Sequence, residues 1–83
     1  MKKMMDLKTI TGVGKNIAEH FRDIGINFVE DLKDKNPEIL YQQACTHAGV
    51  KLDRCLLYVF REAVYFAKGG RDPEKLKWWN WKD

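Results

Sequence analysis

Two glycines that flank one apolar residue and precede a lysine, Gly12-Val13-Gly14-Lys15, are the strongest candidates for chemistry in this chain. Glycine reaches backbone conformations with positive φ in which a side chain would clash, so this spacing suits a tight turn. A helix that begins directly after Gly14 would present backbone N–H groups without partners and the positive end of its dipole. Lys15 adds a full positive charge beside that end. The pattern therefore predicts a turn that binds phosphate.

The same residues do not form a P-loop. That motif requires a glycine where Thr9 stands and a serine or threonine where Asn16 stands, and no strand pattern leads into it. The remaining alternative is a tight turn that joins two helices and binds nothing.

Apolar residues on both sides extend the pattern to apolar-x-x-apolar-x-Gly-apolar-Gly-x-x-x-Ala, through Leu7, Ile10 and Ala18, with Phe21 behind. This pattern resembles the helix-hairpin-helix motif, which grips the sugar-phosphate backbone of DNA through the hairpin amides. Contacts of this kind position a protein without reading sequence. The resemblance implies a backbone-binding segment made of Thr11, Gly12, Val13, Gly14, Lys15 and Asn16. Lys8, Arg22 and Lys51 could add donors for phosphate around it; the alternative is a solvated helix face of mixed charge.

The charge balance permits an acidic partner but does not demand one. The 83 residues carry 15 Lys and Arg against 12 Asp and Glu, a net charge of +3, so we expect any DNA binding to be weak. No apolar run approaches the about 20 residues of a membrane span. The basic start at Met1 is interrupted by Asp6 before a signal-peptide core forms. We expect a soluble cytoplasmic protein that does not contact a membrane.

The residue types that bind metals are badly spaced. Cys45, His47 and Cys55, with His20 far away, fit no structural zinc pattern. We expect both cysteines to be small buried residues in a reducing compartment, and neither a metal nor a cofactor.

Catalysis is also not indicated. Asp31 and Asp34 lack the apolar cleft that an acid or base requires. A lysine that attacks abasic sugars would need a lowered pKa, and every lysine here stands in a polar stretch. We therefore expect no enzymatic activity, with such a lyase as the alternative.

No alternation of period two appears, so we predict helices throughout. The fold class is all-α: a compact, SAM-like bundle of five to six short helices. Caps and glycine stops place helices at about 7–10, 15–24, 28–32, 37–48, 52–68 and 75–81. Asn27 and Glu30 would cap the third, which would bury Phe28, Val29 and Leu32. One domain, 1–83, would contain a hairpin (about 6–24), a connector (28–34), a helical pair (37–68) and a Trp-rich helix (72–83).

The helix at 52–68 is apolar nearly all round, which predicts that it is buried among its neighbours. Val59, Phe60, Ala63 and Val64 should be fully buried. Arg61 and Glu62 are interpreted as structural ties, and Arg61 should pair with a C-terminal carbonyl or Asp83.

Two further patterns leave alternatives open. Gly49-Val50-Lys51 echoes Gly12-Val13-Gly14, which suggests a second, degenerate hairpin. Trp78 and Trp81 share a helical face and could clamp the tail onto the core, whereas Trp79 should be exposed, where it could stack on a base or contact a partner.

Blocks along the whole chain resemble one family. They are Gly12-Val13-Gly14-Lys15, Gly25-Ile26 with Val29-Glu30-Asp31-Leu32, the run from Leu52 to Arg61, and the run from Asp72 to Trp81. Together they resemble the pathogenicity-locus family of small bacterial proteins, which similarity also links to mitomycin-resistance proteins. The resemblance implies an all-helical domain with a helix-hairpin-helix. We expect a DNA-binding module without sequence preference; the alternative is a module that binds another protein or itself.

Overall fold

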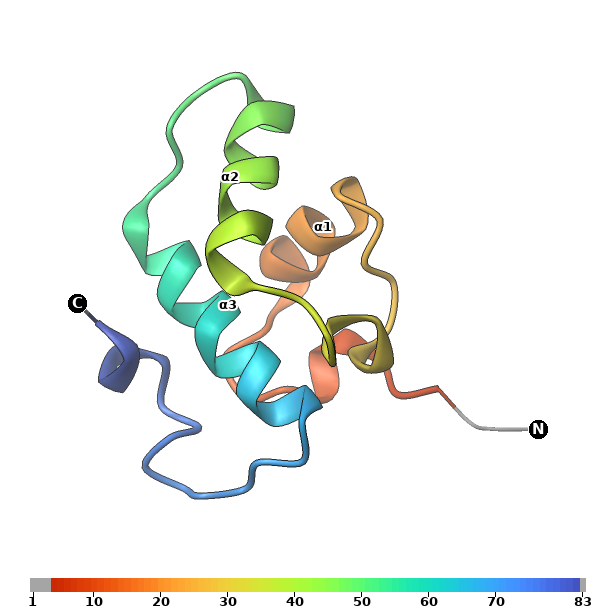
Figure 1. Cartoon of the computed structure of the whole chain (residues 1–83), viewed down its shortest axis with the longest axis vertical. Coiled ribbons are helices and arrows are strands. Elements are labelled where there is room, and N and C mark those ends of the chain that lie inside the picture. The colour runs from red at the N-terminus through yellow and green to blue at the C-terminus, as the bar shows by residue number, and fades with distance from the viewer. Residues whose placement is uncertain (1–3, 83) are drawn as a thin grey trace.

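The computed structural model describes residues 4–82, which form three α-helices and three short 3-10 helices (Figure 1). The α-helices are α1 (Lys15–Asp23), α2 (Pro37–Ala48) and α3 (Arg54–Ala67). The 3-10 helices are η1 (Leu7–Thr9), η2 (Val29–Leu32) and η3 (Trp78–Trp81). Within the described range there is no strand, only an isolated bridge between Asp6 and Phe28. The all-α prediction is confirmed, although three of the expected helices are single 3-10 turns.

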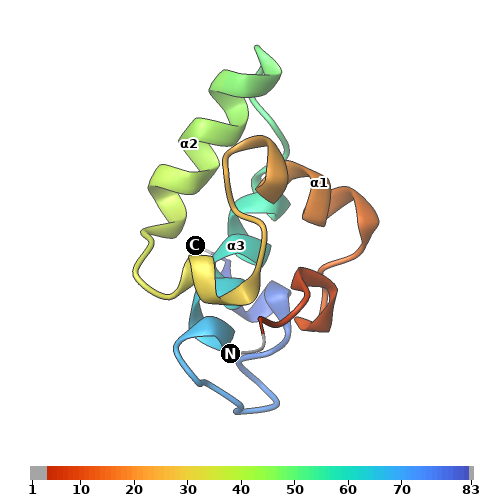
Figure 2. The same cartoon turned by 90° about the vertical axis from the view of Figure 1, so that its right-hand side faces the viewer.

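The longest helix, α3, runs through the middle of the molecule (Figures 1 and 2). It contacts α2, η2 and the C-terminal η3, which explains why apolar residues surround it almost completely. The prediction that Val59, Phe60, Ala63 and Val64 are buried is confirmed. Phe60 stacks on Phe21 of α1 with 4.4 Å between ring centroids, so α1 is tied to the same core.

Side chains cap the starts of η1, α2 and α3, although α3 begins at Arg54 rather than at about residue 52 as predicted. Asp6 accepts a hydrogen bond from the Lys8 amide, and Asp53 accepts one from the Cys55 amide. The Asn36 side chain accepts from the Glu38 amide at 2.9 Å, with Pro37 in the first turn of α2. These bonds satisfy N–H groups that the helices themselves leave unused.

The predicted start of the helix at 28–32 is wrong. Asp31, not Glu30, accepts the amides of Asn27 and Phe28, at 2.9 and 3.0 Å. Glu30 instead accepts the distant Met5 amide at 2.9 Å. Phe28 is 40% exposed rather than buried, because it stands before η2 and not on its inner side.

The tail is less helical than predicted, since only Trp78–Trp81 form η3. The carbonyl of Glu74 accepts from the Asn80 side chain at 2.8 Å, and that of Lys75 accepts from the Trp81 indole at 2.7 Å. Side chains therefore occupy carbonyls that a continuous helix would pair with backbone amides. Trp78 packs against the core, and the ring of Trp81 lies 5.6 Å from that of Tyr65.

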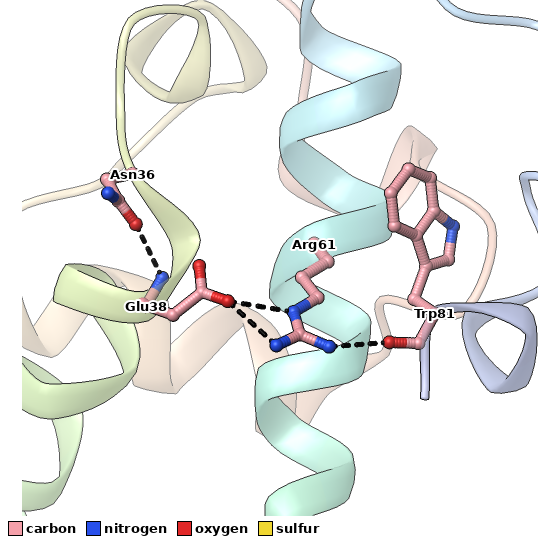
Figure 3. A network of polar contacts seen from close by, with 4 residues as sticks. All are labelled: Asn36, Glu38, Arg61 and Trp81. Carbon is pink, nitrogen blue, oxygen red and sulfur yellow. Dashed lines mark hydrogen bonds and ion pairs between the residues drawn. The ribbon is translucent and has the colours of Figure 1, made fainter. Parts of the chain in front are cut away.

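Arg61 joins three elements (Figure 3). Its Nε and Nη2 donate to Glu38 Oε1 of α2 at 3.0 and 2.7 Å, and its Nη1 donates to the Trp81 carbonyl of η3 at 2.7 Å. The predicted C-terminal carbonyl is thus found, whereas Asp83 lies outside the described residues. The guanidinium fixes α2, α3 and η3 relative to one another.

The two similar glycine segments differ in packing. Gly12 and Gly49 both adopt positive φ, 88° and 74°. However, Val13 is 5% exposed and Val50 is 62% exposed. The second segment therefore ends α2 without inserting its valine into the core. None of the helices within residues 4–82 combines the length and the hydropathy that a membrane span requires.

Candidate nucleic-acid interface

The glycine turn, residues 10–14, joins η1 to α1. Gly12 has φ +88°, a conformation that favours glycine. The Val13 amide donates to the Ile10 carbonyl at 3.1 Å, and the Val13 side chain is buried. Val13 therefore shapes the turn, and its amide is already used within it. This distinguishes Val13 from the other residues of the predicted phosphate-binding segment.

The start of α1 is open to an external acceptor. Gly14 is its N-cap and supplies no side-chain hydrogen bond. The hydrogen bond from the Ala18 amide to the Gly14 carbonyl is 3.0 Å long. The earlier amides, of Lys15, Asn16 and Ile17, lie in the first turn, where a helix cannot pair them. Lys15 and Asn16 are exposed, as a contact with a phosphate would require.

The fold places different constraints on the two glycines of the turn. A Cβ at Gly12 would lie 3.2 Å from Glu62 Oε1 and 3.5 Å from Trp78 Cδ1, in addition to the strain of the positive φ. Gly14 has φ −96° and ψ −168°, which any residue adopts. A Cβ there would meet nothing within 4 Å. The fold requires glycine at position 12 but not at position 14.

The supporting cations predicted from the sequence surround this turn at different distances. Lys8 is exposed in η1, directly before the turn. Arg22 is exposed on the same face of α1 as Lys15 but about 10 Å further along the helix, because each residue adds about 1.5 Å. Lys51 is exposed and precedes Leu52, which lines a pocket together with Gly12 and Asn16.

That pocket has a volume of about 430 Å³ and lies between the glycine turn, α1, the start of α3 and the tail. Leu52 is held in its wall by the hydroxyl of Tyr41, which donates to its carbonyl, and by its own amide, which donates to Cys45 Sγ at 3.4 Å. The lining combines apolar and polar side chains: Asn16, Ile17, His20, Leu52, Asp53, Cys55, Leu56, Val59 and Trp78, with Gly12.

Trp78 brings the tail to the turn, although the two segments are far apart in the sequence. Trp79 is 49% exposed, which confirms the expectation for this residue, and it packs edge-on against Trp78 with 5.7 Å between ring centroids. The exposed indole is therefore held beside Trp78, which lines the same pocket as Gly12.

The sequence did not predict the surroundings of Glu62. This residue is completely buried below Gly12, and neither carboxylate oxygen has a hydrogen-bond partner in the described structure. The interpretation as a structural tie is therefore wrong. Burial raises the pKa of Glu62 to about 8, so the carboxyl is mostly protonated at neutral pH. The only signal was its position between Phe60 and Ala63 on the helix predicted to be most buried.

The two cysteines behave differently from the prediction that both are buried. Cys45 is half-buried, and Cys55 is exposed at the start of α3. The hydrogen bond with Asp53 raises the pKa of the Cys55 thiol, which keeps it in the less reactive protonated form. Among residues 4–82, no three His, Cys, Asp or Glu side chains gather as metal ligands would.

Comparison with known proteins identifies the family. A family model described as "Pathogenicity locus" matches residues 1–83, the whole chain. The chain belongs to the Pathogenicity locus family. This confirms the resemblance on which the sequence analysis relied.

The chain is also similar to a curated protein, the mitomycin resistance protein McrB of Streptomyces lavendulae. The two are 37% identical over 76 residues, which is 92% of this chain and 70% of McrB. No solved structure matches the chain. The assignment to the family therefore rests on sequence similarity.

Proposed function

We propose that this chain binds DNA through its sugar-phosphate backbone, without sequence preference, and that residues 6–24 act as a helix-hairpin-helix. One phosphate would accept hydrogen bonds from the first-turn amides of α1, with the Lys15 ammonium beside it. Thr11, Gly12 and Asn16 would frame this contact. Lys8, Arg22 and Lys51 would add charge at neighbouring phosphates.

The observation that carries the proposal is Gly14. Its backbone conformation is open to any residue, and a side chain would meet nothing within 4 Å. For helix stability alone, Ser, Asp, Thr or Asn would serve at least as well at an N-cap. A bare N-cap does, however, leave the first-turn amides unoccupied and lets another backbone approach closely. A bound phosphate would explain why glycine stands at this position, whereas the requirements of the fold alone do not explain it.

The test uses Gly14→Asp, because this substitution separates folding from binding. Aspartate is a favoured N-cap, so the variant should unfold at the same or a higher temperature than the wild type. Its carboxylate would occupy the amides and repel phosphate. We expect the wild type to bind duplex DNA with a Kd of about 10⁻⁴–10⁻⁶ M. The Gly14→Asp variant should lose most of this binding.

Fluorescence anisotropy with two unrelated duplexes across a salt series measures both affinity and sequence preference. Lys15→Ala is the matched control, since it removes one charge and leaves the amides free; it should weaken both duplexes alike and reduce the salt slope by about one. Wild-type protein that binds neither duplex at low salt would refute the proposal. Unchanged binding by Gly14→Asp would show that DNA is held elsewhere.

The alternative, a module that binds another protein or itself, is favoured by one observation. Ile39 is 51% exposed and lines a shallow groove between α1 and α2 with Ile24. Ile39→Asp should leave a monomer unchanged and dissociate a self-associated form. Light scattering of the wild type and the Ile39→Asp variant at several concentrations distinguishes a monomer from a self-associated form.

A further inference from the structure

A pocket lies beside the glycine turn, next to the proposed phosphate contact. We propose that this pocket takes one unpaired base of the DNA strand whose phosphate is held at the start of α1. The inference rests on the proposed function and specifies the DNA structure that the site prefers. A base inside an intact duplex is stacked and paired, so only a bulged, mismatched or extruded base can enter.

Position is the first argument. Gly12 and Asn16 belong both to the proposed phosphate contact and to the lining of the pocket. Ile17, whose amide lies in the first turn of α1, also lines it. A nucleotide with its phosphate on these amides would therefore have its base within reach of the pocket.

The chemistry of the lining is the second argument. The Trp78 indole forms one wall, and the apolar side chains of Ile17, Leu56 and Val59 form others. An aromatic wall suits the π-face of any base, so stacking there would not select a sequence. Asn16, His20 and Asp53 offer hydrogen-bond donors and acceptors, which match the polar edges of a base.

The third argument is that the walls are fixed in advance. Trp78 packs against the core and edge-on against Trp79. Asp53 is held as the N-cap of α3 by the Cys55 amide at 2.8 Å. A site whose walls are already ordered loses little entropy on binding.

The test compares three DNA duplexes of the same sequence by fluorescence anisotropy at low salt. One is fully paired, one carries a single bulged nucleotide, and one carries a bulged abasic nucleotide. The abasic bulge bends and loosens the DNA in a similar way but offers no base. We expect the bulged base to be bound about tenfold more tightly than the other two, as one base–aromatic stack allows.

A pocket-filling variant locates the effect. Cys55 is exposed, lines the pocket and lies outside the phosphate contact, so Cys55→Phe should fill the pocket while binding to the paired duplex persists. Its preference for the bulged base should disappear. Gln42→Phe is the matched control, because it places an aromatic side chain at an exposed position of α2. This variant should keep the preference for the bulged base. Thermal melts verify that both variants fold.

The outcomes are distinct. Equal affinity for all three duplexes, equal gain from both bulges, or a preference that survives in a folded Cys55→Phe variant would each overturn the base pocket while backbone binding stands. If Cys55→Phe does not fold, bulged 2-aminopurine replaces it: stacking on Trp78 should quench its fluorescence, and unchanged emission on saturation would overturn the pocket. Absence of binding to every duplex would overturn the proposed function and the pocket together.

Discussion

Glu62 is a buried carboxyl whose two oxygens lack a hydrogen-bond partner among the described residues. A carboxyl without a hydrogen-bond partner is tolerated in a dry core only when it is neutral. Burial raises its pKa from 4.5 to about 8, so the folded protein keeps a proton that the unfolded chain has already released at intermediate pH. The unfolded state binds fewer protons in this window, and the free energy of unfolding should therefore fall as the pH rises from 4.5 towards 8.

Glu62→Gln tests this pH dependence. The amide has nearly the shape of the protonated carboxyl but does not titrate, so the variant should resemble the wild type near pH 4.5 and exceed its stability as the pH rises. At about pH 7 the advantage should be on the order of 3 kcal/mol. Urea denaturation of both proteins across this range measures it. Parallel stability curves would contradict a buried, neutral Glu62.

At the scale of elements, the Arg61 network holds α2, α3 and the tail together through a single side chain. Arg61→Met keeps the aliphatic stem but leaves the Trp81 carbonyl and the Glu38 carboxylate without this donor. We expect a loss of about 2 kcal/mol in the free energy of unfolding, because hydrogen bonds to charged groups are worth about 1.5–3 kcal/mol each. Chemical denaturation measures the loss.

Glu38→Gln is the matched control, since it weakens the ion pair and leaves the bond to the tail. It should cost less than about 1 kcal/mol, because the Glu38 side chain is half exposed. Arg61→Met should also shift tryptophan emission, whereas Glu38→Gln should not. Equal effects of the two substitutions would show that the bond to the Trp81 carbonyl contributes little.

Helix ends that are fixed by residues only a few positions away could be predicted from the sequence. Asp6, Asn36-Pro37 and Gly49 mark helix ends through adjacent groups, and the structure uses each of them. The start of η2 could not be predicted, because Glu30 bonds to Met5 from a distant part of the chain and Asp31 takes over the capping. Competition between local and distant partners is invisible to a local pattern.

The candidate site shows the same division. The glycine turn and the start of α1 follow from spacing alone. The roles of its two glycines do not, because Gly12 is constrained by Glu62 and Trp78, which reach it only after the chain has folded. The pocket was missed for this reason: its walls come from the turn, α1, the start of α3 and the tail, and no single stretch of sequence contains them.

At the scale of the molecule, the tail completes the core. Leu76 and Trp78 pack against it, and Arg61 bonds to the tail backbone. Deletion of residues 72–83 should therefore expose apolar surface of α3 and lower the melting temperature. Circular dichroism melts of the full and shortened chains measure the difference, and equal melting temperatures would show that the tail is not part of the folded core.

The proximity of Gly12 and Trp78 also bears on the order in which the chain matures. The two residues stand far apart in the sequence, yet a Cβ at Gly12 would lie 3.5 Å from Trp78 Cδ1 in the folded chain. During synthesis the glycine turn leaves the ribosome well before its partner Trp78 does. A nascent chain thus carries the turn without the indole that lies beside it in the folded protein, and the surface proposed to hold DNA is completed only after Trp78 has emerged.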